Sequence, residues 1–449
     1  MSSKSPKALD ELPMTAFQWK VTLLSSMGMF MDGYVLTIFS TAFPIPKWGL
    51  RAVFSPSGVE AGLMASASLI GMFIGALSFG HLADEFGRKK TYTYDLSLTA
   101  GFLLLTALAN NWLEFFVFQV GAGIGIGADY PISSSIQSEF SPREKRGMLL
   151  VLNIFAWTIG SIVFLLLSIP FYALGPVSWR VMYASSAVIP LLVIASRSSL
   201  PETPSWLLLK GKKEEAERSA ERLAREAGVS PSEAVAGLTV DAGPSSLREL
   251  FSKQFLRLTL FSSIAWFSYD FASYGVWNFT PSIFASTSSY TMAILATLLE
   301  EVPVFVGFAV CVSLVEKKGR KSLQELGFLG AGVSLVAFAL YAHFVPNAMS
   351  YTALAFSAFA LMHVFHNIGP TNLTYAYPSE VFPTRLRGTA HGFATTVSRL
   401  GGVLGTVAVA VGFFSYNISV VLMVVAVFEF LGFAVTYLWA PEVKGKKLL

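Results

Sequence analysis

The chain has 449 residues, of which 53% are hydrophobic and only 13% are charged, and its formal net charge is +4. Soluble domains carry about 25% charged residues, so this deficit excludes an ordinary soluble protein and indicates a polytopic membrane protein. The basic residues lie in short loops between apolar runs, as orientation signals do, and the net charge therefore gives no reason to expect a nucleic-acid partner.

Apolar runs of membrane-spanning length recur along the chain, since a helix that crosses the hydrocarbon core needs about 20 mostly apolar residues. Six runs precede residue 200, at about 18–43, 58–82, 91–110, 112–138, 147–173 and 178–199. Six more follow residue 255, at about 257–285, 290–315, 321–344, 349–377, 388–414 and 417–440. The pattern predicts an all-α membrane protein with twelve transmembrane helices in two six-helix halves, residues 1–200 and 256–449.

The stretch between the halves, residues 201–255, is the one clearly soluble part of the sequence. Gly211 to Gly228 reads as an exposed helix with acid–base pairs four residues apart, such as Glu214–Arg218. Most basic loop residues, including Arg88 to Lys90, Arg143 to Arg146, Lys317 to Lys321, Arg385, Arg387 and Lys444 to Lys447, fall on the side of this linker. The positive-inside rule then predicts a cytoplasmic linker, cytoplasmic termini and a multi-pass protein of the cell membrane.

Three aspartates, Asp32, Asp129 and Asp270, lie inside apolar runs, where a carboxylate is costly. Asp129 follows alternate glycines in GIGIGADYPISSSIQSE, Gly123 to Glu139. Without a βαβ pattern around them, these glycines are only a weak signal for dinucleotide binding. In a membrane helix, small residues instead let a neighbouring backbone approach closely. Such acids usually face a bundle interior or a wet cavity. Each is therefore a functional hypothesis, the alternative being neutralisation in a structural hydrogen bond.

Two loop motifs carry a resemblance. GHLADEFGRKK (Gly80 to Lys90) and VEKKGRKS (Val315 to Ser322) resemble the repeated loop signature of the major facilitator superfamily. PETPSWLL (Pro201 to Leu208) and PSEVFPTRLRG (Pro378 to Gly388) resemble its sugar-porter-like branch. The resemblance implies a secondary transporter whose two halves rock about a site near the bilayer midplane.

Longer motifs resemble the phosphate:proton symporters of that superfamily: GIGIGADYPISSSIQSE, GMFMDGY around Asp32, WFSYDFASYG around Asp270, and HNIGPTNLTYAYPSEVFPTRLRGTAHG. The resemblance implies import of inorganic phosphate by alternating access, with protons coupled through Asp32 and Asp129. It places the phosphate site on five residues, Tyr130, Trp266, Asp270, Tyr274 and Asn367. Trp266, Asp270 and Tyr274 share one helix face; an ionised Asp270 would repel an anion, so we expect it to be protonated or paired with the co-transported proton.

Three positions depart from that family. Val35 occupies the position of a second acid in that family, and Gln119 occupies the position of an arginine. Thr158, beside Trp157, occupies the position of a glutamine that helps to hold phosphate in the family. Thr158 is nevertheless the expected substrate-binding residue of the fifth helix. These departures keep open another small organic anion or a sugar as the solute.

Charged residues at the ends of the predicted helices on the linker side resemble pairs that gate the contact between the halves. The alternative interpretation is that they anchor the helix ends at the membrane surface. These residues are Asp84, Arg88, Glu139, Arg143, Glu202, Glu380, Arg385 and Arg387. Arg399 lies within the eleventh run, where it could attract an anion or pair with an acid. His363 and His366 read as core histidines or pH sensors. Glu300 and Glu301 point about 100° apart on a helix, so we expect that they do not both face one cavity.

Other classes fit the sequence less well. A nutrient receptor that binds without transporting would typically carry long soluble tails, and an enzyme would need a catalytic or metal-ligand pattern that we do not find. The single cysteine, Cys311, excludes an intramolecular disulfide and a cysteine-based metal site. We therefore expect a monomeric transporter with no metal and no cofactor, whose partners are a small anion, protons and the lipid bilayer.

Overall fold

The computed structural model describes residues 9–236, 238, 246–277, 289–344, 352–415 and 418–446. Within these ranges all regular structure is helical, which confirms the predicted all-α fold. Parts of four predicted features, residues 278–285, 349–351 and 417 and Lys447, lie outside the described residues.

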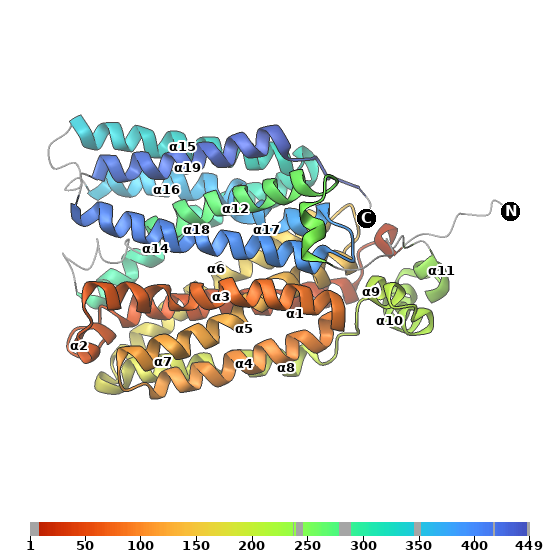
Figure 1. Ribbon diagram of the computed structural model, residues 1–449, viewed down its shortest axis with the longest axis horizontal. Helices are drawn as coiled ribbons and strands as arrows, with labels where there is room; N and C mark the ends of the chain where they lie inside the picture. Colours follow the sequence, from red (N-terminus) through yellow and green to blue (C-terminus); the bar gives the residue numbers. More distant parts are fainter. Residues whose placement is uncertain are drawn as a thin grey trace.

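The long helices form two groups that lie side by side, one above the other in Figure 1. The first group is α1 (Ala16–Ala42), α3 (Gly58–Phe86), α4 (Arg88–Leu108), α5 (Trp112–Phe140), α6 (Arg146–Tyr172), α7 (Ser178–Ser186) and α8 (Val188–Arg197). The second is α12 (Leu256–Trp277), α14 (Tyr290–Lys318), α15 (Arg320–Phe344), α16 (Thr352–Ile368), α17 (Pro370–Val381), α18 (Arg387–Ser415) and α19 (Ile418–Trp439). We refer to the two groups as the first half and the second half.

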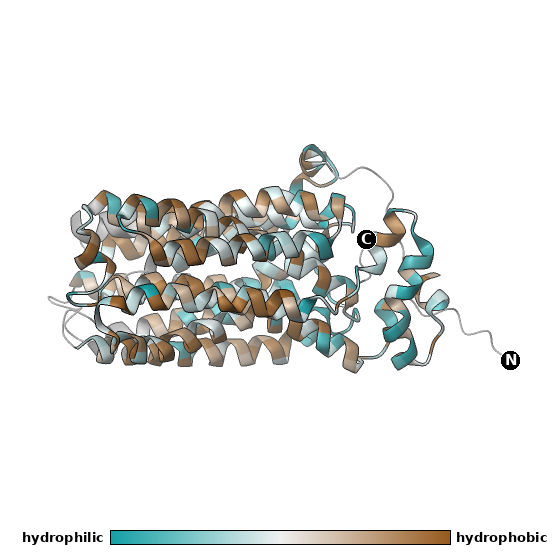
Figure 2. Cartoon of the chain, turned by 90° about the horizontal axis from the view of Figure 1, so that it is seen from below, coloured by the Kyte–Doolittle hydropathy of each residue, from teal (hydrophilic) through white to brown (hydrophobic). Residues whose placement is uncertain are grey.

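Short helices occupy the connections. They are η1 (Leu9–Glu11), α2 (Leu50–Phe54), η2 (Gly175–Val177), α9 (Pro204–Leu209), α10 (Lys213–Ala227), α11 (Pro231–Ala236) and η3 (Leu247–Phe251). The helices α9 to α11 lie beyond one end of the bundle, which we call the linker end (Figure 1). Figure 2 shows hydrophobic residues along the long helices and mostly hydrophilic residues on the helices beyond this end.

Eight stretches in the described residues are long and apolar enough to cross a membrane: α1, most of α3, α5, α6, the segment from Gly175 to Arg197, α14, α15 and most of α19. The other predicted spans coincide with α4, α12, α16 with α17, and α18. Charged residues interrupt two of them, since α4 carries three basic residues and Asp95, and α18 carries Arg387 and Arg399.

Two of the predicted spans contain a break in the helix. The run at 178–199 forms α7 and α8, which meet at Ala187, because Pro190 cannot donate to Ser186 and its ring crowds that carbonyl. The run at 349–377 forms α16 and α17 in its described part. The break is at Gly369, immediately before Pro370.

Glycines let helices touch backbone to backbone, as the alternate glycines before Asp129 predict. A Cβ on Gly123 or Gly127 of α5 would run into the backbone of α3, at Ser68 and Met72. The same contact joins the halves, since a Cβ on Gly392 of α18 would collide with the Ala76 carbonyl of α3. The seam between the halves is therefore narrow at this point.

The linker helices are attached to the first half. The Trp206 indole Nε1 of α9 donates to the Asp84 carbonyl at 2.9 Å. Glu226 of α10 accepts from the Phe17 backbone N at 2.8 Å, which caps the first turn of α1. The linker therefore holds two helices of the first half at their linker ends.

Candidate functional site

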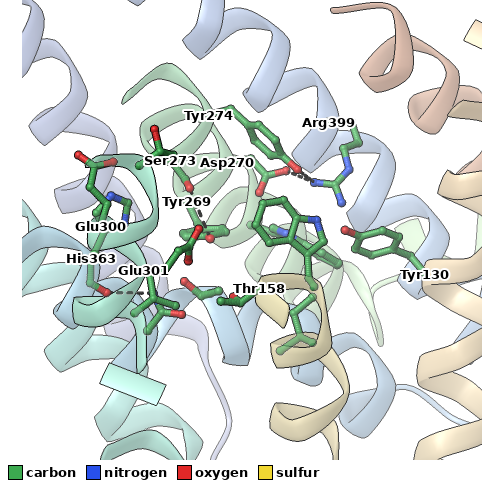
Figure 3. Close-up of a pocket in the computed structure, with 17 residues that line it drawn as sticks. Tyr130, Thr158, Tyr269, Asp270, Ser273, Tyr274, Glu300, Glu301, His363 and Arg399 are labelled. Atoms are coloured by element: carbon green, nitrogen blue, oxygen red, sulfur yellow. Dashed lines mark hydrogen bonds and ion pairs between the residues drawn. The ribbon is translucent and has the colours of Figure 1, made fainter. Parts of the chain in front are cut away.

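A cavity of about 100 Å³ lies between the two halves, which is enough for several waters or one small solute. Four of its lining residues come from α5 and α6 of the first half, and the others come from the second half. The lining residues are Tyr130, Ile154, Trp157, Thr158, Trp266, Tyr269, Asp270, Ser273, Tyr274, Thr297, Glu300, Glu301, Val304, His363, Asn367, Thr371 and Arg399 (Figure 3). Aromatic rings and hydroxyl groups dominate this wall.

The structure brings all six of the expected substrate-binding residues to this one cavity: Tyr130, Thr158, Trp266, Asp270, Tyr274 and Asn367. They come from α5, α6, α12 and α16. The three residues of α12 share a face because they are four residues apart, as the sequence predicts. Trp266 and Tyr130 lie against each other, with ring centroids 6.2 Å apart.

Arg399 forms a buried ion pair in the cavity wall. Its Nη1 lies 2.7 Å from Asp270 Oδ2 and 3.2 Å from the Tyr274 hydroxyl. The guanidinium also lies over the ring of Tyr130, 4.5 Å from the centroid, where a cation is attracted to the π face. Of the two roles that the sequence leaves open for Arg399, the structure shows the pairing with an acid.

Asp32 lies one layer behind the cavity. The Tyr130 hydroxyl donates a short hydrogen bond to Asp32 Oδ2, and Tyr130 itself borders the cavity. Arg399 is close enough to act electrostatically on Asp32 as well as on Asp270. One arginine therefore faces two buried carboxylates, one of them in the cavity and the other reached through a tyrosine.

Asp129 lies apart from the cavity, although the sequence groups it with Asp32. Its Oδ1 is 2.5 Å from Arg197 Nη1, and its Oδ2 accepts from Ser133 Oγ at 2.7 Å. Arg197 also donates to the carbonyls of Leu24 and Ser25, both at 2.8 Å. Asp129 thus joins α5 to α8, and through Arg197 to α1, which matches the structural alternative for this acid.

Several buried charged residues were not identified as candidates from the sequence. Arg197 is one of them, and Asp95 of α4 is another: it is fully buried, and neither of its carboxylate oxygens has a hydrogen-bond partner in the described part of the chain. Glu429 is a third and lies 2.7 Å from His366 Nε2. The signal that would find them is a charged residue inside an apolar run, because each such residue needs a reason to be there.

Glu300 and Glu301 both border the cavity, so the expectation that they cannot share one is wrong. The lining contributed by α14 includes both glutamates together with Thr297 and Val304. Each residue keeps 8% of its surface exposed. His363 borders the same cavity, whereas His366 does not and pairs with Glu429.

Charged residues at the linker end join the two halves. Arg387 of α18 lies 3.1 Å from Glu139 of α5, and Arg88 of α4 lies 3.2 Å from the same carboxylate oxygen. Arg88 also donates to the Thr384 carbonyl of the second half at 3.2 Å. These contacts fit the sequence prediction that residues at these helix ends meet across the halves.

Three of the other residues expected in that gate have partners on their own side of the seam. Glu380 lies 3.0 Å from Arg320, which is also in the second half. Arg143 lies 3.0 Å from Glu11 of η1, and Arg385 pairs with Glu249 of η3. The pairs of Arg143 and Arg385 anchor connecting segments to helix ends, which is the other interpretation that the sequence leaves open, whereas the buried pair of Glu380 with Arg320 joins α17 to α15.

The chain matches the family described as sugar (and other) transporter over residues 21–449. It belongs to this family. The Escherichia coli inner membrane metabolite transport protein YgcS is 30% identical over 99% of this chain and 96% of its own length. The Acinetobacter baylyi niacin transporter NiaP is 27% identical over 89% and 88%. A probable inorganic phosphate transporter of Arabidopsis thaliana is 27% identical over 98% and 94%.

The fold has solved counterparts. A structure of the major facilitator superfamily proton:xylose symporter XylE superimposes with a TM-score of 0.82 and 20% identity, over 96% of this chain and 98% of that one. The chain therefore has the major facilitator fold and is a multi-pass membrane transporter of the sugar-porter-like branch, and its family and structural neighbours are transporters rather than enzymes.

Proposed function

We propose that the protein is a proton-coupled symporter that imports a small organic solute through the cavity between its halves by alternating access. The observation that carries the proposal is the sharing of Arg399 between two buried carboxylates, Asp270 in the cavity wall and Asp32 behind Tyr130. The proposal includes the cell membrane as its location, with the linker end in the cytoplasm, because the basic loops gather at that end.

The charge balance of this cluster gives a reason for proton coupling. When both carboxylates are ionised, Arg399 balances one of them and leaves one buried negative charge, which is costly. A single proton on Asp32 or Asp270 makes the cluster neutral. Protonation of Asp270 also releases Arg399 from its partner, so that the guanidinium becomes available to a polar or anionic group of the solute. The proton and the solute then stabilise the same state of the cluster, in which Asp270 is protonated and Arg399 contacts the solute.

The conformational step would separate the halves at the linker end. That movement breaks the contact of Arg387 with Glu139 and the hydrogen bond of Arg88 to the Thr384 carbonyl. Both contacts are buried, so that leaving either partner unpaired is costly until water enters. In this reading the structure is a state closed towards the cytoplasm.

Two features favour an organic solute over phosphate. Trp157, Trp266 and Tyr269 line the cavity with apolar surface that a phosphate ion does not use, and two glutamates add negative charge. Inorganic phosphate remains a second candidate, because five residues that the phosphate symporters use meet in the cavity and several relatives are named as phosphate transporters. A niacin transporter among the relatives makes niacin a reasonable organic probe.

The test is uptake into proteoliposomes of the purified protein, with niacin and phosphate as labelled probes, with and without an inward proton gradient. We expect gradient-driven accumulation of an organic solute. Asp32→Asn should abolish that accumulation and keep exchange of labelled for unlabelled solute, since Asp32 does not border the cavity. Glu214→Gln, on the exposed face of α10, is the matched control.

Accumulation of niacin that ignores the gradient would contradict the proton coupling. Accumulation of phosphate alone would move the assignment to the second candidate. Binding without any exchange would contradict transport altogether and would favour a receptor.

A further inference from the structure

Glu300 and Glu301 are the two ionisable groups of the cavity that the proposed mechanism does not use. Both lie on α14, one turn of helix before Val304, and both are more than nine-tenths buried. Neither carboxylate has a hydrogen-bond or ion-pair partner in the described part of the chain. Buried carboxylates without a partner are rare because the charged form loses its hydration and gains nothing in return.

No lysine lines the described cavity, and His363, the one histidine of the lining, forms no ion pair or hydrogen bond with either glutamate. Arg399 is the one arginine of the lining, and its Nη1 is held by Asp270 at 2.7 Å and by the Tyr274 hydroxyl at 3.2 Å. In Figure 3 the two glutamates and His363 stand at one side of the cavity, with Arg399 and Tyr130 at the other. The cavity therefore has an acidic side and a side where an arginine is already paired.

Aromatic rings lie beside the acidic side. Tyr269 and Trp157 line the same cavity, and Figure 3 shows Glu301 turned towards Tyr269. The face of an aromatic ring attracts a cation, and this attraction is strongest where water is excluded. Carboxylates and aromatic faces together form the surroundings that a positively charged nitrogen prefers.

We propose that Glu300 and Glu301 form a cation subsite, and that the transported solute carries a positively charged nitrogen, either a protonated amine or a quaternary ammonium. The solute supplies the counter-charge that the protein lacks at this place. A monovalent cation balances one carboxylate, and the second carboxylate then keeps a proton. The subsite rests on the proposed function, because it assigns the chemistry of the solute that the same cavity would carry.

Binding to the purified full-length protein tests the subsite without any need for transport. The probe is choline, and the matched control is 3,3-dimethylbutan-1-ol, which has the same shape with a neutral carbon in place of the nitrogen. Binding is read from the tryptophan fluorescence of the protein, since Trp157 and Trp266 line the cavity, at neutral and alkaline pH. We expect choline to bind at least about tenfold more tightly than its neutral isostere, a factor worth about 1.4 kcal/mol.

The double variant Glu300→Gln/Glu301→Gln should lose this preference, and Glu214→Gln should keep it. Equal binding of the two probes to the wild-type protein at both pH values would overturn the subsite, whether or not the double variant folds. An unchanged preference in a folded double variant would overturn it too, because another group would then hold the cation.

The uptake assay separates the two proposals. Gradient-driven uptake of niacin or phosphate together with equal binding of choline and its isostere would leave the proton-coupled function standing and remove the cation subsite. A choline preference that depends on the glutamates, together with solute uptake that ignores the proton gradient, would keep the subsite and remove the proton coupling.

Discussion

Asp84 of the first half caps a helix of the second half at Thr389. Its carboxylate accepts from the Thr389 backbone N at 2.7 Å, from the Thr389 hydroxyl at 2.8 Å and from the Gly388 backbone N at 3.2 Å. These donors belong to the first turn of α18, which has no partner for them within the helix. Arg88, 3.1 Å away, holds the carboxylate in position. The cap therefore binds the halves to each other at the linker end.

Asp84→Asn is expected to weaken this closure, because an amide offers one acceptor oxygen where the carboxylate offers two and its N–H₂ group faces backbone N–H groups. Spin labels on cysteines introduced at Glu85 and Lys318 report the separation of the halves at the linker end. We expect a longer distance between the two labels to gain population in the Asp84→Asn variant. Glu214→Gln, labelled at the same two positions, is the control. An unchanged distance distribution would contradict the role of the cap.

Gly28→Ala is expected to destabilise the protein by about 1–3 kcal/mol, the usual range for an overpacked core. A Cβ at this position collides with the Asp129 carboxylate and crowds the Arg197 guanidinium. The measurement is thermal unfolding in detergent. Gly62→Ala is the matched control: nothing lies within 4 Å of its added Cβ and the residue is inside α3, so this substitution should leave the stability unchanged or raise it slightly. Equal melting temperatures for the two variants would show that the ion pair tolerates the methyl group.

Asp95→Asn and Asp129→Asn are expected to differ sharply, although both remove one buried carboxylate from the first half. Asp95 has no hydrogen-bond partner in the described residues, so its neutral isostere should cost little or raise the stability. Asp129→Asn removes the carboxylate that pairs directly with Arg197 and leaves only the electrostatic influence of Asp95, which does not hydrogen-bond to it; losing such a direct partner typically costs about 3–5 kcal/mol. Thermal unfolding of both variants beside the wild type checks the contrast. Equal losses would mean that the electrostatic interaction of Asp95 with Arg197 stabilises the fold as much as the direct pair of Asp129 with Arg197.

Glu226 of the linker caps α1 through a hydrogen bond whose strength depends on pH. The hydrogen bond from the Phe17 backbone N lowers the pKa of the Glu226 carboxyl below its ordinary value, because the bond favours the ionised form. The contribution of this cap to stability is therefore present at neutral pH and is lost as the pH falls through the lowered pKa. We expect Glu226→Gln to melt below the wild type at neutral pH, and the gap to close in acid. A gap that stays constant with pH would contradict this assignment.

The sequence predicted most of the fold because its signals are local. Apolar runs, turn glycines and basic loops each depend on a few neighbouring residues. The family resemblance then assigned Tyr130, Trp266 and Asp270 to one substrate site. The breaks at Ala187 and Gly369 also had a local signal, in Pro190 and Pro370, which the length of the apolar runs outweighed. Nothing in a run of twenty apolar residues requires that the helix be continuous.

Pairings between distant residues could not be read from the sequence. Asp129 and Arg197 are 68 positions apart, and Asp270 and Arg399 are 129 apart, so the partner of each acid depends on which helices become neighbours. The proton-coupling role of Asp129 was inferred from its depth in an apolar run and from the family resemblance, and neither of these reports its partner. That Glu300 and Glu301 share one cavity depends on how α14 packs against the six other helices that line it, which no local pattern reports.

The walls of the cavity are divided unequally between the halves, since thirteen of the seventeen lining residues belong to the second half. The ion pair of Asp129 with Arg197 lies in the first half, away from these walls. Substitutions on α12, α14 or α16 can therefore change what fits in the cavity without disturbing that pair. Evolution could alter solute preference in a lineage of such proteins while the internal framework of the other half stays constant.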